Sequence, residues 1–241
     1  MRPTVTGVDG CKGGWVAVTL SPEDVTVTVA GALADLNLRG ACGIDMPLGL
    51  LAAGWRTADA LARHALGRRG ATVFAIPPRS VWERGTYAEA NTTCRRLTGR
   101  GLSVQAWGLR ARLLEADRFR ASRPATECPA AEDCPAAQCP AAEDCPATLY
   151  EVHPELSFSA LAGAPVPASK HSAEGLAVRR RLLTAAGITL PAGRIAGAGD
   201  DDVLDATAVA WSARRILRGT AVSLTDPEQR ADDNSEIAIR Y

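Results

Sequence analysis

The chain opens with Thr4-Val5-Thr6-Gly7-Val8-Asp9-Gly10-Cys11-Lys12-Gly13-Gly14, and this segment decides the fold. Its β-branched residues predict a short strand over residues 4–10, and the glycines that follow allow the positive φ angles of a tight turn. Residues 15–20 and 25–30 are apolar and β-branched in the same way. The sequence therefore predicts three neighbouring strands that form an antiparallel meander.

Strands and helices alternate further along the chain. A fourth strand is predicted over residues 41–45 and a fifth over residues 148–153, whereas the tail beyond residue 219 offers at most one short strand. Apolar residues at helical spacing predict helices over residues 57–66, 87–99, 109–123, 174–187 and 201–217. This order predicts an α/β fold in which helices cover the faces of a mixed sheet.

The composition is ordinary for a globular protein of one domain, which we expect to span residues 1–241. Hydrophobic residues make up 46% of the chain, and 27 basic residues balance 27 acidic ones. No apolar run approaches the ~20 residues of a membrane-spanning helix, and the start resembles a strand rather than a signal peptide. We therefore expect a cytoplasmic protein without a membrane partner, whose seven cysteines are reduced.

Residues 124–148 have a different composition, because a Cys-Pro and Ala repeat fills residues 129–146. The segment lacks aromatic and β-branched residues to bury, so we expect a disordered insertion in the domain. A metal cluster is the less favoured alternative, since cysteine spacings of six, five and six residues do not match a zinc knuckle.

Acidic residues stand where the predicted strands end and where the last helix begins. Asp9 ends the first strand, Asp45 ends the fourth, and Glu151 lies near the end of the fifth. Asp202 and Asp205 are three residues apart, so they share one face of the last helix. Buried carboxylates are costly unless they are paired or bound to a cation, and ligands gather at the carboxyl ends of strands.

The acid pattern predicts a metal site. Carboxylates without cysteine partners favour Mg²⁺ or Mn²⁺, and two such ions would hydrolyse a phosphodiester bond. Simpler roles compete at single positions. Asp9 also suits an Asp-Gly turn, and Asp201 or Asp202 could cap the last helix, a role that suits Asp200 and Asp201 best. The apolar helix that follows Asp205 argues against a capping role for that residue.

Three further residues are candidates for substrate contacts. His153 precedes a proline at a predicted strand-to-helix junction, where it would serve as a general base, as a phosphate contact or as a helix cap. Lys12 and Arg79 are candidate phosphate-binding residues. Residues 56–123 contain fourteen Arg against five acidic residues, which favours a phosphate-facing surface, although a general preference for arginine is the alternative.

Four segments resemble the DUF429 family, whose members are described as predicted nucleases of the RNase H-like fold. These segments are Gly-Val-Asp-Gly-Cys-Lys-Gly-Gly-Trp at 7–15, Ile-Asp-Met-Pro-Leu-Gly at 44–49, Glu-Val-His-Pro-Glu at 151–155 and Asp-Asp-Val-Leu-Asp-Ala at 201–206. Residues 72–79, 105–107 and 169–175 also resemble family motifs. The resemblance covers nearly the whole chain, and only the Cys-Pro repeat departs from it.

The resemblance implies an RNase H-like domain with a central five-stranded sheet, in which the first three strands are antiparallel. It also implies a carboxylate site similar to that of RuvC-type resolvases. The residues that match the metal ligands of such a site are Asp9, Asp45, Asp202 and Asp205. Glu151 and His153 belong to the family's own motif, which implies that Glu151 acts as a ligand or as a supporting base and makes His153 a catalytic candidate.

A metal-dependent nuclease that cleaves DNA or RNA is therefore the favoured hypothesis. A non-catalytic nucleic-acid or protein-binding module is the first alternative, and it predicts salt-sensitive binding that survives loss of the acids. An ATP-binding phosphotransferase also begins with a strand, an aspartate and a glycine-rich turn. The chain is short for such a duplicated fold, and it contains neither a Walker motif nor a Gly-x-Gly-x-x-Gly motif after a strand.

Overall fold

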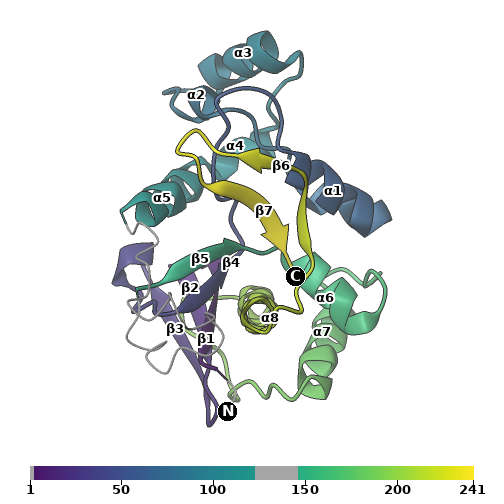
Figure 1. Ribbon diagram of the computed structural model, residues 1–241. Helices are drawn as coiled ribbons and strands as arrows, with labels where there is room; N and C mark the ends of the chain where they lie inside the picture. The colour runs from purple at the N-terminus through teal and green to yellow at the C-terminus, as the bar shows by residue number, and fades with distance from the viewer. Residues whose placement is uncertain (1–2, 123–145) are drawn as a thin grey trace.

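The computed structural model describes residues 3–122 and 146–241 (Figure 1). Five strands in this part of the chain form one sheet in the order β3-β2-β1-β4-β5. The strands are β1 (Val5–Cys11), β2 (Gly14–Leu20), β3 (Val25–Ala30), β4 (Ala41–Ile44) and β5 (Thr148–Glu151). β1, β2 and β3 pair antiparallel with one another, and β4 and β5 run parallel to β1. The predicted mixed five-stranded sheet is thus confirmed.

The helices follow the predicted pattern closely. They are α1 (Thr57–Leu66), α2 (Arg79–Trp82), α3 (Tyr87–Thr98), α4 (Val104–Gly108), α5 (Arg110–Ala121), α6 (Pro154–Ala162), α7 (Ala173–Ala185) and α8 (Asp200–Leu217), with 3₁₀ turns η1 (Leu33–Asp35) and η2 (Gly67–Thr72). The five longest predicted helices are all present, and their ends differ from prediction by at most two residues. Within the described ranges, no helix combines the length and apolarity that a membrane crossing requires.

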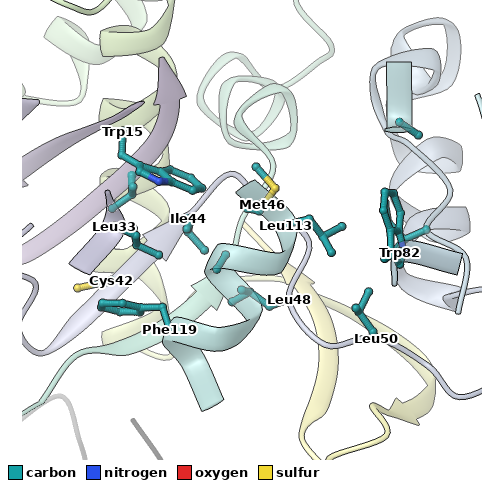
Figure 2. Packing of buried hydrophobic residues seen from close by; sticks show 14 of the residues in the cluster. Trp15, Leu33, Cys42, Ile44, Met46, Leu48, Leu50, Trp82, Leu113 and Phe119 are labelled. Carbon is teal, nitrogen blue, oxygen red and sulfur yellow. The ribbon is translucent and has the colours of Figure 1, made fainter. Parts of the chain in front are cut away.

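Each face of the sheet packs against its own hydrophobic core, because alternate side chains along a strand point to opposite faces. Val16 and Val18 of β2 pack with residues of α6, α7 and α8. Trp15 precedes these two valines in β2 and points to the other face. It packs there with Ile44 of β4 and Phe119 of α5 (Figure 2). Helices therefore cover both faces, as predicted.

Helix α8 rests directly on the middle of the sheet. Gly7 of β1 and Gly43 of β4 are register partners and both face this helix. A Cβ on Gly7 would lie 2.1 Å from the carbonyl oxygen of Ala206, and a Cβ on Gly43 would lie 2.7 Å from Cγ1 of Val209. Only glycine at these two positions lets the helix backbone approach the strands so closely.

The tail after residue 219 forms two strands, so the prediction of at most one was wrong. β6 (Ser223–Arg230) and β7 (Glu236–Arg240) make a separate antiparallel pair that packs beside α1 (Figure 1). The pattern of β6 concealed it, because this strand is largely polar and contains Pro227. The apolar residues Ile237 and Ile239 of β7 are buried in a third core cluster.

The predicted insertion at 124–148 lies mostly outside the described residues. Its last residues already belong to the sheet: Pro146 forms a bridge with Arg39, Ala147 is buried and Thr148 pairs with Ala41. Within the described part of the chain, the cysteines are the buried Cys11, Cys42 and Cys94, and none of them forms a disulfide.

The contact between α8 and β1 yields a prediction about stability. Gly7→Ala would place a methyl group inside the helix backbone, so we expect it to lower the free energy of unfolding by about 3 kcal/mol or more. Gly31→Ala is the matched control, because a Cβ at Gly31 meets nothing within 4 Å. Urea unfolding of both variants measures the difference, and equal stabilities would contradict the close contact.

Candidate functional site

Three predicted metal ligands converge at the C-terminal edge of the sheet. Asp9 follows Gly7 by two residues, and Asp45 follows Gly43 by two, so both carboxylates point to the face that α8 covers. Asp205 lies on α8 next to the residue that touches Gly7. The same glycine contacts that seat the helix therefore bring the three carboxylates together.

The three acids repel one another in a buried setting. Burial raises the pKa of Asp9 well above its usual value, and the charges of Asp45 and Asp205 raise it further. Burial also raises the pKa of Asp45 to about 7 and that of Asp205 to about 6, although the charge of Lys170 acts in the opposite direction. The site thus contains more negative charge than its surroundings neutralise.

Asp45 is the least compensated member of this group. Oδ1 of Asp9 accepts a hydrogen bond from the amide of Gly10 at 2.7 Å, and Asp205 is paired with a lysine. The carboxylate of Asp45, in contrast, has no hydrogen-bond or ion-pair partner among residues 3–122 and 146–241. An acid left without a partner between two cavities has the character of a binding group rather than a structural one.

Lys170 is the site residue that sequence reasoning missed. It lies in the loop between α6 and α7, and its Nζ atom is 2.5 Å from Oδ2 of Asp205. Asp205, Asp9 and Asp45 all raise the pKa of this ammonium group, so it stays charged at neutral pH. A signal was present in the composition, because the chain has 25 Arg and only two Lys.

Asp202, the fourth predicted ligand, belongs to the start of α8. Its Oδ2 atom accepts a hydrogen bond from the amide of Gly199 at 2.9 Å, which is one half of a capping box. Its charge nevertheless contributes to the raised pKa of Asp9. The helix cap thus uses the residue that the resemblance assigned to the metal, and Asp200 and Asp201 accept no capping hydrogen bond.

Glu151 is embedded in a buried ion-pair network. Nη2 of Arg56 lies 2.6 Å from both carboxylate oxygens, and the amide of Leu48 donates to Oε2 at 2.7 Å. Nε of Arg56 also lies 3.3 Å from Oδ1 of Asp59. Burial raises the pKa of Glu151 to about 7, although the charge of Arg56 and the amide of Leu48 act in the opposite direction.

Glu151 lines one cavity together with Asp9 and Asp45, but its side chain has a different orientation. Glu151 is the register partner of Ile44, so its side chain points to the face of the sheet opposite to Asp45. Through the amide of Leu48 it holds the chain segment that follows Asp45. The structure thus places Glu151 where it supports the loop beyond Asp45.

His153 stands beside the acids as a neutral imidazole. It precedes α6 at the N-cap position, yet its side chain makes no capping hydrogen bond. Burial lowers its pKa. Nε2 lies 3.5 Å from the carbonyl oxygen of Thr72, and Nδ1 is buried without a hydrogen-bond partner in the described part of the chain.

Two cavities meet at this edge of the sheet. The smaller, with a volume of about 160 Å³, is lined by Asp9, Asp45 and Arg112. The larger, of about 380 Å³, is lined by Asp45, Asp205 and Lys170. His153 lines both cavities, as Asp45 does, so these two residues mark where the cavities adjoin.

The residues predicted to bind phosphate line neither cavity. Lys12 is exposed in the turn between β1 and β2, and Arg79 forms ion pairs with Asp117 and Asp232. Lys12 and Arg79 as phosphate contacts stay predictions that the site geometry does not favour.

Two other arginines of the predicted Arg-rich region reach the cavities instead. Arg112 of α5 lines the smaller one, where its Nη2 donates to the carbonyl oxygen of Cys11 at 2.5 Å. Arg69 of η2 lines the larger one and pairs with Glu155 at 2.7 Å. Composition predicted such arginines as a group, but which of them face the site depends on tertiary packing.

The fold and the site together define an α/β protein with a carboxylate cluster at the end of its central strands. A family model described as "Protein of unknown function (DUF429)" matches residues 7–230. The chain therefore belongs to the DUF429 family, which confirms the resemblance. Searches of curated proteins and of solved structures found no match.

The buried network predicts a structural role for Glu151. Glu151→Gln removes one of the two acidic partners of the fully buried Arg56, the other being Asp59, so we expect a loss of about 3–5 kcal/mol in the free energy of unfolding. The exposed ion pair of Glu228 with Arg230 provides the control, and Glu228→Gln should cost less than about 1 kcal/mol. Chemical denaturation tests both, and a loss no larger than the control's would speak against the network.

Mutual repulsion of the acids predicts that removing the charge of Asp9 stabilises the protein. Asp9→Asn keeps the side-chain oxygen that accepts from the amide of Gly10 but removes the carboxylate, whose pKa the fold raises. Each pKa unit by which the fold raises a carboxyl group costs about 1.4 kcal/mol of stability once the group is ionised. We expect a gain of at least about 1 kcal/mol at pH 8 in EDTA, or about 2–4 °C in Tm. Calorimetry measures it against Asp24→Asn, an exposed control, and a lower Tm would refute the repulsion.

Proposed function

We propose that the protein is a metal-dependent nuclease that hydrolyses phosphodiester bonds of DNA or RNA at Asp9, Asp45 and Asp205. The observation that carries this proposal is the convergence of three carboxylates from β1, the end of β4 and α8 at one edge of the sheet, with Lys170 as their only basic ion-pair partner in the described residues. A cluster that raises the pKa values of its own members is costly for the fold, which points to a functional role.

The donor set fits a hard divalent cation. Asp9, Asp45 and Asp205 offer carboxylate oxygens, the ligands that Mg²⁺ and Mn²⁺ prefer. Within residues 3–122 and 146–241, no three His, Cys, Asp or Glu side chains are assembled closely enough to hold an ion as they stand. Mg²⁺ or Mn²⁺ held by these oxygens would supply Lewis-acid activation of a phosphate and of water.

The rest of the site suits a polyanionic substrate. Arg112 and Arg69 approach the acids from two sides, and arginine binds phosphate oxygens with two parallel hydrogen bonds. His153 offers a neutral Nδ1 atom without a partner in the described chain, which suits a proton acceptor or a hydrogen-bond acceptor. Glu151 and Arg56 hold the loop that follows Asp45. A cytoplasmic location is consistent with this function and remains a prediction.

The proposal predicts metal-dependent cleavage of a labelled panel of single-stranded, double-stranded and branched DNA, RNA and RNA–DNA hybrid. We expect cutting with Mn²⁺ or Mg²⁺ and none in EDTA, because the acids alone do not activate water. Asp45→Asn should lower the cleavage rate at least about a hundredfold. Asp24→Asn, with its carboxylate exposed in the β2–β3 turn, should cut at the wild-type rate.

Three results would contradict this function: no cutting by the folded wild-type protein, cutting that persists in EDTA, or full activity of Asp45→Asn. Salt-sensitive binding without cutting, retained after loss of Asp9, Asp45 and Asp205, would instead identify a nucleic-acid-binding module. Strong ATP binding in a calorimeter would identify a phosphotransferase.

A further inference from the structure

The loop that carries Lys170 is held firmly in place. Gly175 in the first turn of α7 lies so close to this loop that a Cβ there would meet the carbonyl oxygen of Ser169 at 1.8 Å. Ser172 caps α7 by accepting from the amide of Gly175, and its hydroxyl donates to the same Ser169 oxygen at 2.8 Å. The residue before Lys170 is thus packed and hydrogen-bonded against the helix.

A buried arginine of α7 binds the backbone of the same loop. Arg179 of α7 is fully buried and donates to the carbonyl oxygen of Ala168 at 3.0 Å. Its Nη2 atom pairs with Glu155 at 2.7 Å, and its guanidinium lies over the ring of Phe158. Ser172 and α7 therefore fix the two residues that precede Lys170, whose ammonium group pairs with Asp205.

The choice of lysine at this position is informative. Arginine fills 25 of the 27 basic positions in the chain, yet the position beside the acid cluster is lysine. An ammonium is a compact point charge, which can act on several carboxylates at once, whereas a guanidinium is a planar fork suited to one. Lys170 is paired with Asp205 and also lies within electrostatic reach of Asp9 and Asp45.

The charges of the cluster then suggest how many ions it binds. Carboxylates bind a metal ion in their ionised form, in which Asp9, Asp45 and Asp205 carry three negative charges, and Lys170 supplies one positive charge. The net charge of these four side chains is then minus two. One divalent cation neutralises it, whereas a second cation would leave an excess of positive charge. Asp202 adds little, because its carboxylate already accepts the amide of Gly199.

We propose that Lys170 takes the place of the second of the two metal ions that the acid pattern predicts, so that the centre binds one divalent cation. This inference rests on the proposed metal-dependent function. Lys170 is then a positioning residue: its ammonium holds Asp205 and balances the cluster, while the single ion is bound by the less compensated carboxylates of Asp45 and Asp9.

The test counts Mn²⁺ ions on the full-length protein by calorimetry and by electron paramagnetic resonance. We expect one ion per chain in the wild-type protein and two in Lys170→Met, with the tightest site strengthened on the order of tenfold because a neighbouring positive charge is lost. Lys12→Met, which removes the exposed lysine, is the matched control and should bind one ion. Lys170→Arg keeps the charge and should also bind one.

The outcomes separate this inference from the proposed function. Two ions on the wild-type protein, or one ion with unchanged affinity on Lys170→Met, would overturn the role of Lys170 and leave the metal centre in place. The absence of any bound Mn²⁺ on the wild-type protein would overturn the metal centre itself, and the role of Lys170 with it. If Lys170→Met does not fold, the same counts apply to Lys170→Gln, and the wild-type count still decides.

Discussion

The contact between α8 and the paired glycines of β1 and β4 is the constraint on which the site depends. Gly7 and Gly43 remove the two side chains that would otherwise keep the helix away from the sheet. Because strand residues two apart share a face, the next residues on that face are the two acids at the strand ends. A helix seated at this distance brings its own acid, Asp205, to the same place. The contact of α8 with Gly7 and Gly43 thereby sets the geometry of the carboxylate cluster.

The cluster also concentrates negative charge, which the surrounding residues neutralise only in part. Arg56 pairs with both oxygens of Glu151, on the face of the sheet opposite to Asp45, and that pair holds a loop. The three acids between the sheet and α8 share one lysine instead, and Asp45 has no hydrogen-bond or ion-pair partner in the described chain. The two sets of acids differ in their partners: Glu151 accepts from an arginine and an amide, whereas the three acids share one ammonium group.

Much of this arrangement follows from local sequence, and the remainder does not. Strand composition and glycine-rich turns predicted the sheet. The acids at strand ends and in the first turns of the last helix predicted Asp9, Asp45 and Asp205 as neighbours. Lys170 escaped prediction because it lies in a loop without periodicity, and only folding brings it to Asp205. The hairpin of β6 and β7 escaped because its polar strand gains stability from its partner rather than from alternation of its own. A sequence pattern predicts the local structure of its own segment. The basic residue that pairs with an acid of this site lies in a distant segment, so the pattern does not reveal it.

Those distant counter-charges are linked to one another through Glu155. A single oxygen of this buried carboxylate accepts from Arg69, which lines the larger cavity, and from Arg179, which supports the Lys170 loop; both distances are 2.7 Å. Glu155 lies in the first turn of α6, two residues after His153. Any displacement of α6 would therefore move the imidazole, an arginine that faces the cavity and the anchor of the lysine together. The basic half of the site is held as one unit, just as the acidic half is held by the glycines beneath α8.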